Sequence, residues 1–139
     1  MKIIICSSIT AAQEVFVVKE RLERDGHIVE IPEGIKNPIL RARTEVSQNE
    51  KAGDKRRGNL IKGYFEKIKK YDVVLVVNPE KRGVKNYIGG NTLIEMAFAH
   101  VLNKKLYVLY PLPELSYSAE ILAMQPIVLN GELDIFESR

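Results

Sequence analysis

The chain has 139 residues, of which 45% are hydrophobic and 28% are charged, proportions that suit one globular domain spanning residues 1–139. A formal net charge of +3 is too small by itself to indicate a nucleic-acid-binding protein, so we do not expect a nucleic-acid partner; binding through the basic surface at residues 55–70 is the minor alternative. No apolar run approaches the roughly 20 residues that cross a membrane, and the opening apolar run is too short for a signal peptide. We therefore expect a cytoplasmic protein with no membrane partner.

Cysteine and histidine, the side chains that most often bind zinc, are scarce in the sequence. Cys6 is the single cysteine, which excludes an internal disulfide and a zinc cluster built from thiolates. It ends an apolar run, which favours a buried, inert thiol over a nucleophile. His27 and His100 lack the spacing of paired metal ligands, and the sequence has neither a P-loop nor the glycine fingerprint of dinucleotide-binding folds. We expect no metal and no cofactor.

The first elements form a strand, a helix and a second strand. An apolar run over residues 2–6 predicts a strand covered on both faces. An apolar stripe at helical spacing follows, formed by Ala11, Val15, Val18 and Leu22. Gly26 is suited to ending this helix in the left-handed conformation, and residues 27–31 predict the second strand. This order within about 30 residues predicts a right-handed βαβ unit.

Residues 33–70 have weaker periodicity. Pro38 is suited to opening a helix, and Gly53 and Gly58 interrupt the pattern, so we expect one broken helix or two. The second piece has an apolar face, formed by Leu60, Ile61, Tyr64, Phe65 and Ile68. Its charges are mostly basic, which favours a solvated helix face. The alternative is a phosphate contact made by Arg41, Arg43 or the basic cluster at residues 55–57.

The second half of the chain alternates strands with helices. The predicted elements are a strand at 73–77, a polar loop at 80–90, a helix at 92–102, a strand at 106–110, a short helix capped by Ser116 and a strand at 126–129. The tail after residue 131 carries three large apolar residues, Leu133, Ile135 and Phe136. We expect the tail to dock on the body of the protein or on a second subunit.

Five strands alternating with helices predict an α/β fold: one doubly wound, five-stranded parallel sheet in the order 2-1-3-4-5, a flavodoxin-like or Rossmann-like three-layer sandwich. In such sheets a ligand binds beyond the carboxyl ends of the strands where the order reverses, here between strands one and three. Two loops meet there, one at residues 7–9 and the other at residues 78–92. We expect the functional site at this point.

Glu95 is an acidic residue within the apolar helix predicted at residues 92–102, and its presence there needs an explanation. An ionised carboxylate in the first turn of such an apolar helix is costly to bury unless it is held or used. One interpretation is a capping box that joins Thr92 and Glu95. The other turns Glu95 into the crevice, where helix N–H groups keep it ionised as a nucleophile and Gly89 and Gly90 let a sugar approach the backbone.

A resemblance favours the second interpretation. The segment Gly90-Asn-Thr-Leu-Ile-Glu95-Met-Ala-Phe-Ala, followed by Asn103-Lys-Lys-Leu-Tyr-Val-Leu, resembles the signature region of the nucleoside 2-deoxyribosyltransferase family, which includes 2′-deoxynucleoside 5′-monophosphate N-glycosidases. The opening strand into Ile5-Cys6-Ser7-Ser8-Ile9 and the run Tyr71-Asp-Val-Val-Leu-Val-Val are similar to that family as well. The resemblance covers about two thirds of the chain in organisation and about 20 residues in recognisable motif.

The resemblance implies cleavage or transfer at the N-glycosidic bond of a 2′-deoxynucleoside or its 5′-phosphate. Glu95 would attack C1′, and water or an acceptor base would resolve the glycosyl-enzyme intermediate. Ser7, Ser8 and Ile9 would take the 5′-OH or 5′-phosphate. The remaining substrate-binding residues would be Asn78, Tyr87, Gly89, Gly90, Asn91, Thr92 and Ser116. The resemblance also implies a homodimer or higher homo-oligomer.

Two positions depart from the pattern of that family. Members usually have an aspartate at the end of the third strand, where this chain has Asn78. They also tend to have Asp-Ser-Gly-Thr before the helix, where this chain has Gly89-Gly-Asn-Thr92. An amide can orient a base but cannot protonate it. The alternative function is therefore a non-catalytic protein of the same fold that binds a nucleotide or a sugar phosphate.

Overall fold

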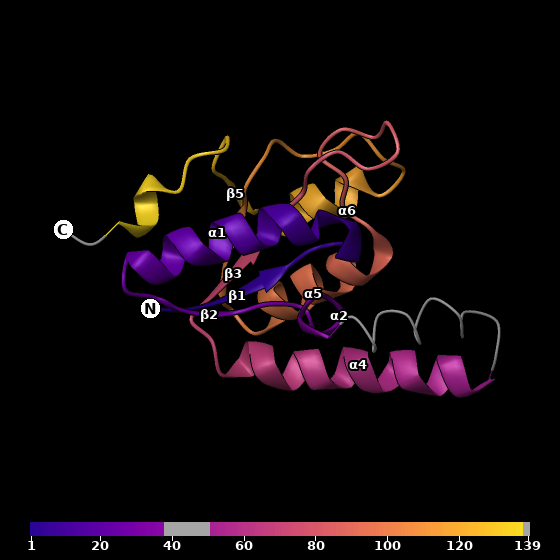
Figure 1. Cartoon of the computed structure of the whole chain (residues 1–139). Helices are drawn as coiled ribbons and strands as arrows, with labels where there is room; N and C mark the ends of the chain where they lie inside the picture. Colours follow the sequence, from indigo (N-terminus) through magenta and orange to yellow (C-terminus); the bar gives the residue numbers. More distant parts are fainter. Residues whose placement is uncertain (38–50, 138–139) are drawn as a thin grey trace.

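The computed structural model describes residues 1–37 and 51–137, with the backbone alone at residues 51–56. The described residues form three layers (Figure 1). Helix α1 (Ala12–Arg24) covers one face of a central sheet, whereas α4 (Lys51–Lys69) and α5 (Gly90–Val101) cover the other. The three-layer arrangement agrees with the predicted fold class.

The sheet has the order β2-β1-β3-β4-β5, and its neighbouring strands are parallel. The strands are β1 (Lys2–Cys6), β2 (Ile28–Glu30), β3 (Val73–Val76), β4 (Lys105–Val108) and β5 (Ile127–Val128). The predicted doubly wound sheet and its strand order are thereby confirmed. Cys6 at the end of β1 pairs with Val76 at the end of β3, so the loops after both strands leave from the same edge.

Short helices complete the described part of the chain. They are η1 (Ile9–Ala11), α2 (Glu33–Lys36), α6 (Ser118–Ala123) and η2 (Asp134–Phe136). The predicted helix before Gly26 is α1, which buries Val15, Val18 and Leu22 on one stripe. Gly26 follows it with a φ of +91°, the left-handed conformation predicted from its position.

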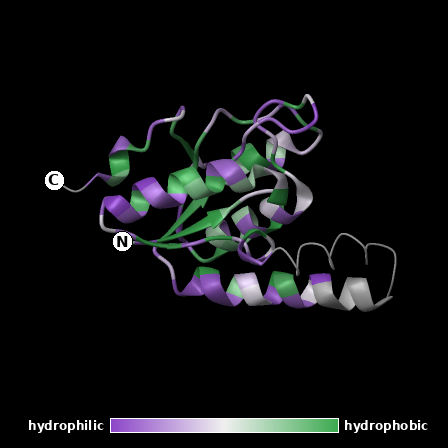
Figure 2. Cartoon of the chain, viewed as in Figure 1, coloured by the Kyte–Doolittle hydropathy of each residue, from purple (hydrophilic) through white to green (hydrophobic). Residues whose placement is uncertain are grey.

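Strand β1 explains why both faces of the sheet are covered. Its residues alternate between two apolar clusters: Ile3 and Ile5 pack with α1, while Ile4 and Cys6 pack on the side of α4 and α5. The strands accordingly form a hydrophobic centre between more polar helices (Figure 2). Burial on both faces is typical of parallel sheets and accounts for the non-alternating apolar sequence of β1 and β3.

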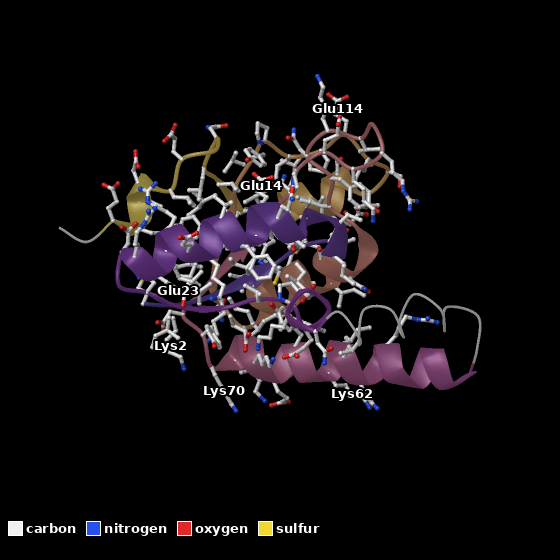
Figure 3. The ribbon with its side chains drawn as sticks, viewed as in Figure 1. Lys2, Glu14, Glu23, Lys62, Lys70 and Glu114 are labelled. Carbon is white, nitrogen blue, oxygen red and sulfur yellow. The ribbon has the colours of Figure 1, made fainter. Side chains whose placement is uncertain are left out.

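Helix α4 corrects the prediction of a broken helix, because it continues through Gly53 and Gly58. A glycine in a helix interior costs about 1 kcal/mol relative to alanine. Burial of Tyr64 and Ile68 beneath the sheet offsets that cost. Lys62 and Lys70, on or next to this helix, are exposed and point away from the sheet, as the solvated-face interpretation predicts (Figure 3).

Other boundaries also differ from the predictions. Helix α5 begins at Gly90 rather than at residue 92, and the N-cap of α6 is Tyr117, not Ser116. The short helix α2 was not predicted, because four residues give too little periodicity to recognise. The predicted helix start near Pro38, Arg41 and Arg43 lie outside the described residues.

The tail docks on the body of the same chain, on the face that carries α1. Leu133 and Phe136 are buried, whereas Ile135 is 56% exposed. Nε2 of His27 donates a hydrogen bond to the carbonyl oxygen of Phe136 at 2.5 Å, and Arg21 pairs with Glu137 at 2.7 Å. Among the described residues, no helix combines the length and apolar character needed to span a bilayer.

Candidate active site

A small cavity lies where the strand order reverses, on the side of the sheet covered by α4 and α5. It has a volume of about 120 Å³ and is bordered by the loop after β1, by α2, by α4 and by the start of α5. Its lining residues are Ser7, Ile9, Pro32, Glu33, Gly34, Arg57, Leu60, Ile61, Tyr64, Asn91 and Glu95. The cavity therefore stands where a doubly wound sheet is expected to bind a ligand.

Glu95 reaches this cavity because of its position along α5. The helix begins at Gly90 with Gly89 as its N-cap, so Glu95 is its sixth residue and lies beyond the first turn. Thr92 is a buried residue inside the helix, and the cap makes no side-chain hydrogen bond. The capping-box interpretation of Thr92 and Glu95 is therefore wrong.

The carboxyl group of Glu95 is in an environment that disfavours its charge. Burial raises the pKa of Glu95 from 4.5 to about 8, and a hydrogen bond with the Cys6 thiol lowers it in part. The free N–H groups of the first helical turn are too far back to keep the carboxylate ionised, contrary to expectation. At pH 7 such a group is ionised in roughly one molecule in ten.

Ser7 contributes the second polar feature of the cavity. Its side chain is only 8% exposed, and its Oγ has no hydrogen-bond partner among the residues that the structure describes. A buried hydroxyl without a partner costs about 1–3 kcal/mol. Because this hydroxyl borders the cavity that holds Glu95, a ligand atom placed there would supply the missing partner.

The wall opposite the sheet comes from α4 and α2, and two sets of contacts hold it. The Tyr64 hydroxyl donates a hydrogen bond to the carbonyl oxygen of Ile5, which ties α4 to β1. Lys67 forms ion pairs with Glu33 and, at 3.4 Å, with Glu30, which tie α4 to α2 and β2. The cavity is thus bounded by elements that are joined across it by buried or half-buried contacts.

Gly34 sets the distance between α2 and the loop after β1. A Cβ atom built on Gly34 would lie 2.8 Å from Cδ1 of Ile9, closer than real Cβ contacts. Since Ile9 also lines the cavity, a larger residue at position 34 would displace a side chain that borders the space shared with Glu95.

Asn78 is held apart from the cavity by its own hydrogen bonds. Its Nδ2 lies 3.1–3.4 Å from the carbonyl oxygens of Asn86, Tyr110 and Pro111, to which it donates, and its Oδ1 accepts from the Tyr110 N–H at 2.9 Å. The side chain is fully buried. Its polar atoms are therefore committed to the backbone of the loops after β3 and β4.

The structure brings together four of the predicted site residues: Glu95, Ser7, Ile9 and Asn91 line one cavity. The other predicted residues do not line it, namely Ser8, Asn78, Tyr87, Gly89, Gly90, Thr92 and Ser116. Several of these residues form contacts with other parts of the protein instead.

Ser8 and Tyr87 meet around Lys81, whose Nζ donates to Ser8 Oγ at 3.2 Å and lies 5.0 Å from the centre of the Tyr87 ring. Gly89 is packed against that side chain, because a Cβ at position 89 would lie 3.1 Å from both Cε1 and the hydroxyl oxygen of Tyr87. Ser116 lines a separate surface groove beside α6. The loop at 79–89 is therefore fastened above the strand ends next to the cavity.

Sequence reasoning missed the contribution of α2 and α4 to this site. The sequence pattern places Tyr64 on the apolar face of its helix and assigns no part in the site to Pro32, Glu33 or Gly34. The signal that pointed here was the basic cluster at residues 55–57, for which a phosphate contact was the alternative; Arg57 does line the cavity. That contact remains a prediction.

The arrangement sets a half-buried carboxyl group, an unpartnered hydroxyl and an amide around a space with apolar walls. It suits a small polar group such as a sugar ring, because ligand pockets for larger molecules are typically about 300–1,000 Å³. A base or a phosphate attached to the ring would lie at the mouth. Comparison of the sequence with protein-family models and with curated proteins finds no match. The fold and site define a doubly wound α/β protein with a carboxyl-bearing cavity at the switch point.

Proposed function

We propose that the protein cleaves the N-glycosidic bond of a 2′-deoxynucleoside or its 5′-phosphate, with Glu95 as the nucleophile. The observation that carries the proposal is that Glu95 faces a cavity shared with Ser7 and Asn91 instead of capping its own helix. The cavity volume of about 120 Å³ suits the sugar alone. The resemblance of the α5 segment to nucleoside 2-deoxyribosyltransferases supports the same assignment.

In the proposed reaction an oxygen of the ionised Glu95 attacks C1′ while the bond from C1′ to the base nitrogen breaks. The electron pair leaves with the base, which takes its proton from water, because Asn78 is committed to the backbone and cannot supply one. Attack of water, or of a second base, at C1′ then frees Glu95. A sugar without the electron-withdrawing 2′-OH tolerates the positive charge that develops at C1′. One carboxylate beside C1′ then contributes strongly to stabilising the transition state.

The raised pKa of Glu95 predicts how this activity depends on pH. A carboxyl group must lose its proton before it can attack, and its pKa in the free protein is about 8. The ratio kcat/KM reports the ionisation of the free enzyme. We therefore expect kcat/KM to rise about tenfold per pH unit below pH 8 and to level off above it.

The test is base release from the four common 2′-deoxynucleosides and their 5′-monophosphates at pH 7 and pH 9, followed by chromatography. We expect release from at least one substrate, faster at pH 9. Glu95→Gln keeps the shape of the side chain and should slow release by about a thousandfold or more, because it removes the nucleophile. Glu120→Gln changes an exposed carboxylate on α6 and should leave release unchanged. Equal rates for Glu95→Gln and the unmodified protein would refute the proposal.

A second candidate function is binding without turnover of a nucleotide or sugar phosphate. The observation that favours it is the closed hydrogen-bond set of Asn78, which removes a polar group from the position where the leaving base would stand. A neutral Glu95 would then donate a hydrogen bond to the ligand. This function predicts that nucleotides raise the melting temperature while no base is released; slow release that depends on Glu95 would exclude it.

The expected homo-oligomer stays a prediction. The outer surface of α5 exposes apolar side chains, with Ile94 38% and Val101 74% exposed. Light scattering coupled to size-exclusion chromatography would give the mass in solution, and a Val101→Glu variant would show whether α5 takes part in the contact.

A further inference from the structure

A second carboxylate borders the cavity that holds Glu95. Glu33 is the first residue of α2, and it lines the same space of about 120 Å³ from the wall that α2 and α4 form. Of the acidic residues that the structure describes, only these two line this cavity. They belong to elements far apart in the chain, so the tertiary fold is what brings the two carboxyl groups to one site.

The two carboxylate oxygens of Glu33 differ in their contacts. Oε1 pairs with Nζ of Lys67 on α4 and lies 3.5 Å from Nζ of Lys36 on α2. Oε2 has no hydrogen bond or ion pair among the described residues. Two cations therefore hold the carboxylate by one oxygen, and the other oxygen remains available to accept a proton.

The two carboxyl groups of the cavity also differ in the charge that their surroundings favour. The hydrogen bond from Lys67 lowers the pKa of Glu33, whereas burial raises the pKa of Glu95 to about 8. At neutral pH Glu33 is therefore a carboxylate, while Glu95 is mostly protonated in the free protein. Two carboxyl groups whose pKa values are pushed apart within one site are typical of acid and base roles divided between them.

The other polar side chains that line the cavity do not serve as a base. Ser7 and Asn91 are uncharged at neutral pH, and Arg57 is a cation. The hydroxyl of Tyr64 donates its hydrogen to a backbone carbonyl. Glu33 is accordingly the lining residue, besides the nucleophile itself, that can take up a proton.

We propose that Glu33 is a further catalytic residue, the general base that takes a proton from the water that attacks C1′. This inference rests on the proposed function, in which Glu95 is bonded to C1′ after the base has left. As the water oxygen bonds to C1′, the bond from C1′ to the Glu95 oxygen breaks, and its electron pair returns to the Glu95 carboxylate. The proton of the water passes to Glu33, which then releases it to solvent. Water is therefore the acceptor, and the reaction is a hydrolysis.

The experiment compares two variants of the same ion-pair network. Glu33→Gln keeps the size of the side chain and still accepts hydrogen bonds from lysine, but it cannot act as a base. Glu30→Gln is the matched control, because Glu30 pairs with Lys36 at 2.5 Å and with Lys67 at 3.4 Å and does not line the cavity. A purely structural role of the network predicts similar losses of activity in both variants.

Each protein is incubated with the 2′-deoxynucleoside or 5′-monophosphate from which the unmodified protein releases base fastest. In Glu33→Gln we expect the first turnover to release base at nearly the unmodified rate and later turnovers to be about a hundredfold slower. Mass spectrometry of the intact protein should then show the sugar group retained on it. Azide attacks C1′ without losing a proton, so it should restore turnover and yield a glycosyl azide. Glu30→Gln should show none of these changes.

Unchanged later turnovers in Glu33→Gln, or a loss that Glu30→Gln matches and azide does not restore, would overturn this inference and leave the role of Glu95 intact. If the unmodified protein releases no base, or releases it equally well without Glu95, the proposed function fails and this inference fails with it. If Glu33→Gln does not fold, Glu33→Ala is measured in the same way, since it leaves both lysines paired with Glu30.

Discussion

The polar residues that follow two neighbouring strands, β3 and β1, differ in whether their hydrogen bonds are satisfied. At the end of β3, Asn78 is fully buried and its side-chain amide satisfies four backbone groups in the loops after β3 and β4. At the end of β1, Ser7 Oγ is buried with no partner among the described residues, and Glu95 beside it bears a pKa raised to about 8 by burial.

The difference separates a polar group that holds the fold together from polar groups that remain available to a ligand. A buried group whose hydrogen bonds are complete stabilises the fold and has nothing left to offer a ligand. A buried hydroxyl without a partner and a carboxyl group forced toward neutrality both cost stability, and both border the same cavity. Such local costs are typical of sites that bind or react.

The largest expected effect concerns Glu95 and the pH dependence of stability. Its folded pKa of about 8 exceeds its ordinary value of 4.5, so the folded state binds the proton more tightly. The contribution to the free energy of unfolding is complete below pH 4.5 and is lost as the pH rises toward 8, by about 1.4 kcal/mol per pH unit. Urea unfolding at several pH values should show this decline, and Glu95→Gln should remove it.

The control for that series is Glu120→Gln, in which the same charge is removed from an exposed position. Its pH dependence should match that of the unmodified protein. If the free energy of unfolding depends on pH equally in the unmodified protein, Glu95→Gln and Glu120→Gln, burial does not raise the pKa of Glu95. The contrast between the two strand ends would then lose its main support.

A second prediction concerns Asn78. Asn78→Ala leaves the Tyr110 N–H and three carbonyl oxygens of the adjoining loops without their partner, so the free energy of unfolding should fall by about 3 kcal/mol or more. Urea unfolding at fixed pH measures the loss. A loss below about 1 kcal/mol would show that water replaces the amide easily and that Asn78 does not hold these loops.

Ser7 should behave in the reverse manner. Ser7→Ala removes a buried hydroxyl with no partner in the described part of the chain, so the free energy of unfolding should rise by about 1 kcal/mol or more. If a ligand forms a hydrogen bond with the Ser7 hydroxyl, its affinity or the kcat/KM should fall about tenfold in Ser7→Ala. A clear loss of stability in Ser7→Ala with unchanged ligand affinity would mean that Ser7, like Asn78, stabilises the fold and does not bind the ligand.

The smallest effect is expected at Gly34. Gly34→Ala must displace the end of the Ile9 side chain, which is flexible and borders the cavity, so stability should change by less than about 1 kcal/mol while substrate affinity falls a fewfold. Binding titrations with Gly63→Ala as control test this, since a Cβ at position 63 meets nothing within 4 Å. Unchanged affinity in Gly34→Ala would place the ligand away from Ile9.

The fold could be predicted because its signals are local. The continuous apolar run of β1, the stripe of α1 and the turn at Gly26 each depend on a few adjacent residues, and the rules for parallel sheets then restrict the strand order. The site was predicted in part for the same reason: the loop after β1 and the start of α5 follow strand ends at the switch point. Asn78 and Tyr87 follow the same rule, yet contacts with the loops after β3 and β4 occupy Asn78, and Lys81 of its own loop occupies Tyr87.

Hydrophobic periodicity and turn chemistry act over short distances, so they suffice to predict the doubly wound sheet and the edge at which its order reverses. The tertiary structure alone decided which polar groups at that edge are satisfied and which are not. Burial and hydrogen bonding depend on segments far apart in the chain: Tyr64 of α4 donates to Ile5 of β1, and Ser7 after β1 lines one cavity with Glu95 of α5. The pKa of Glu95 therefore follows from the packing around it.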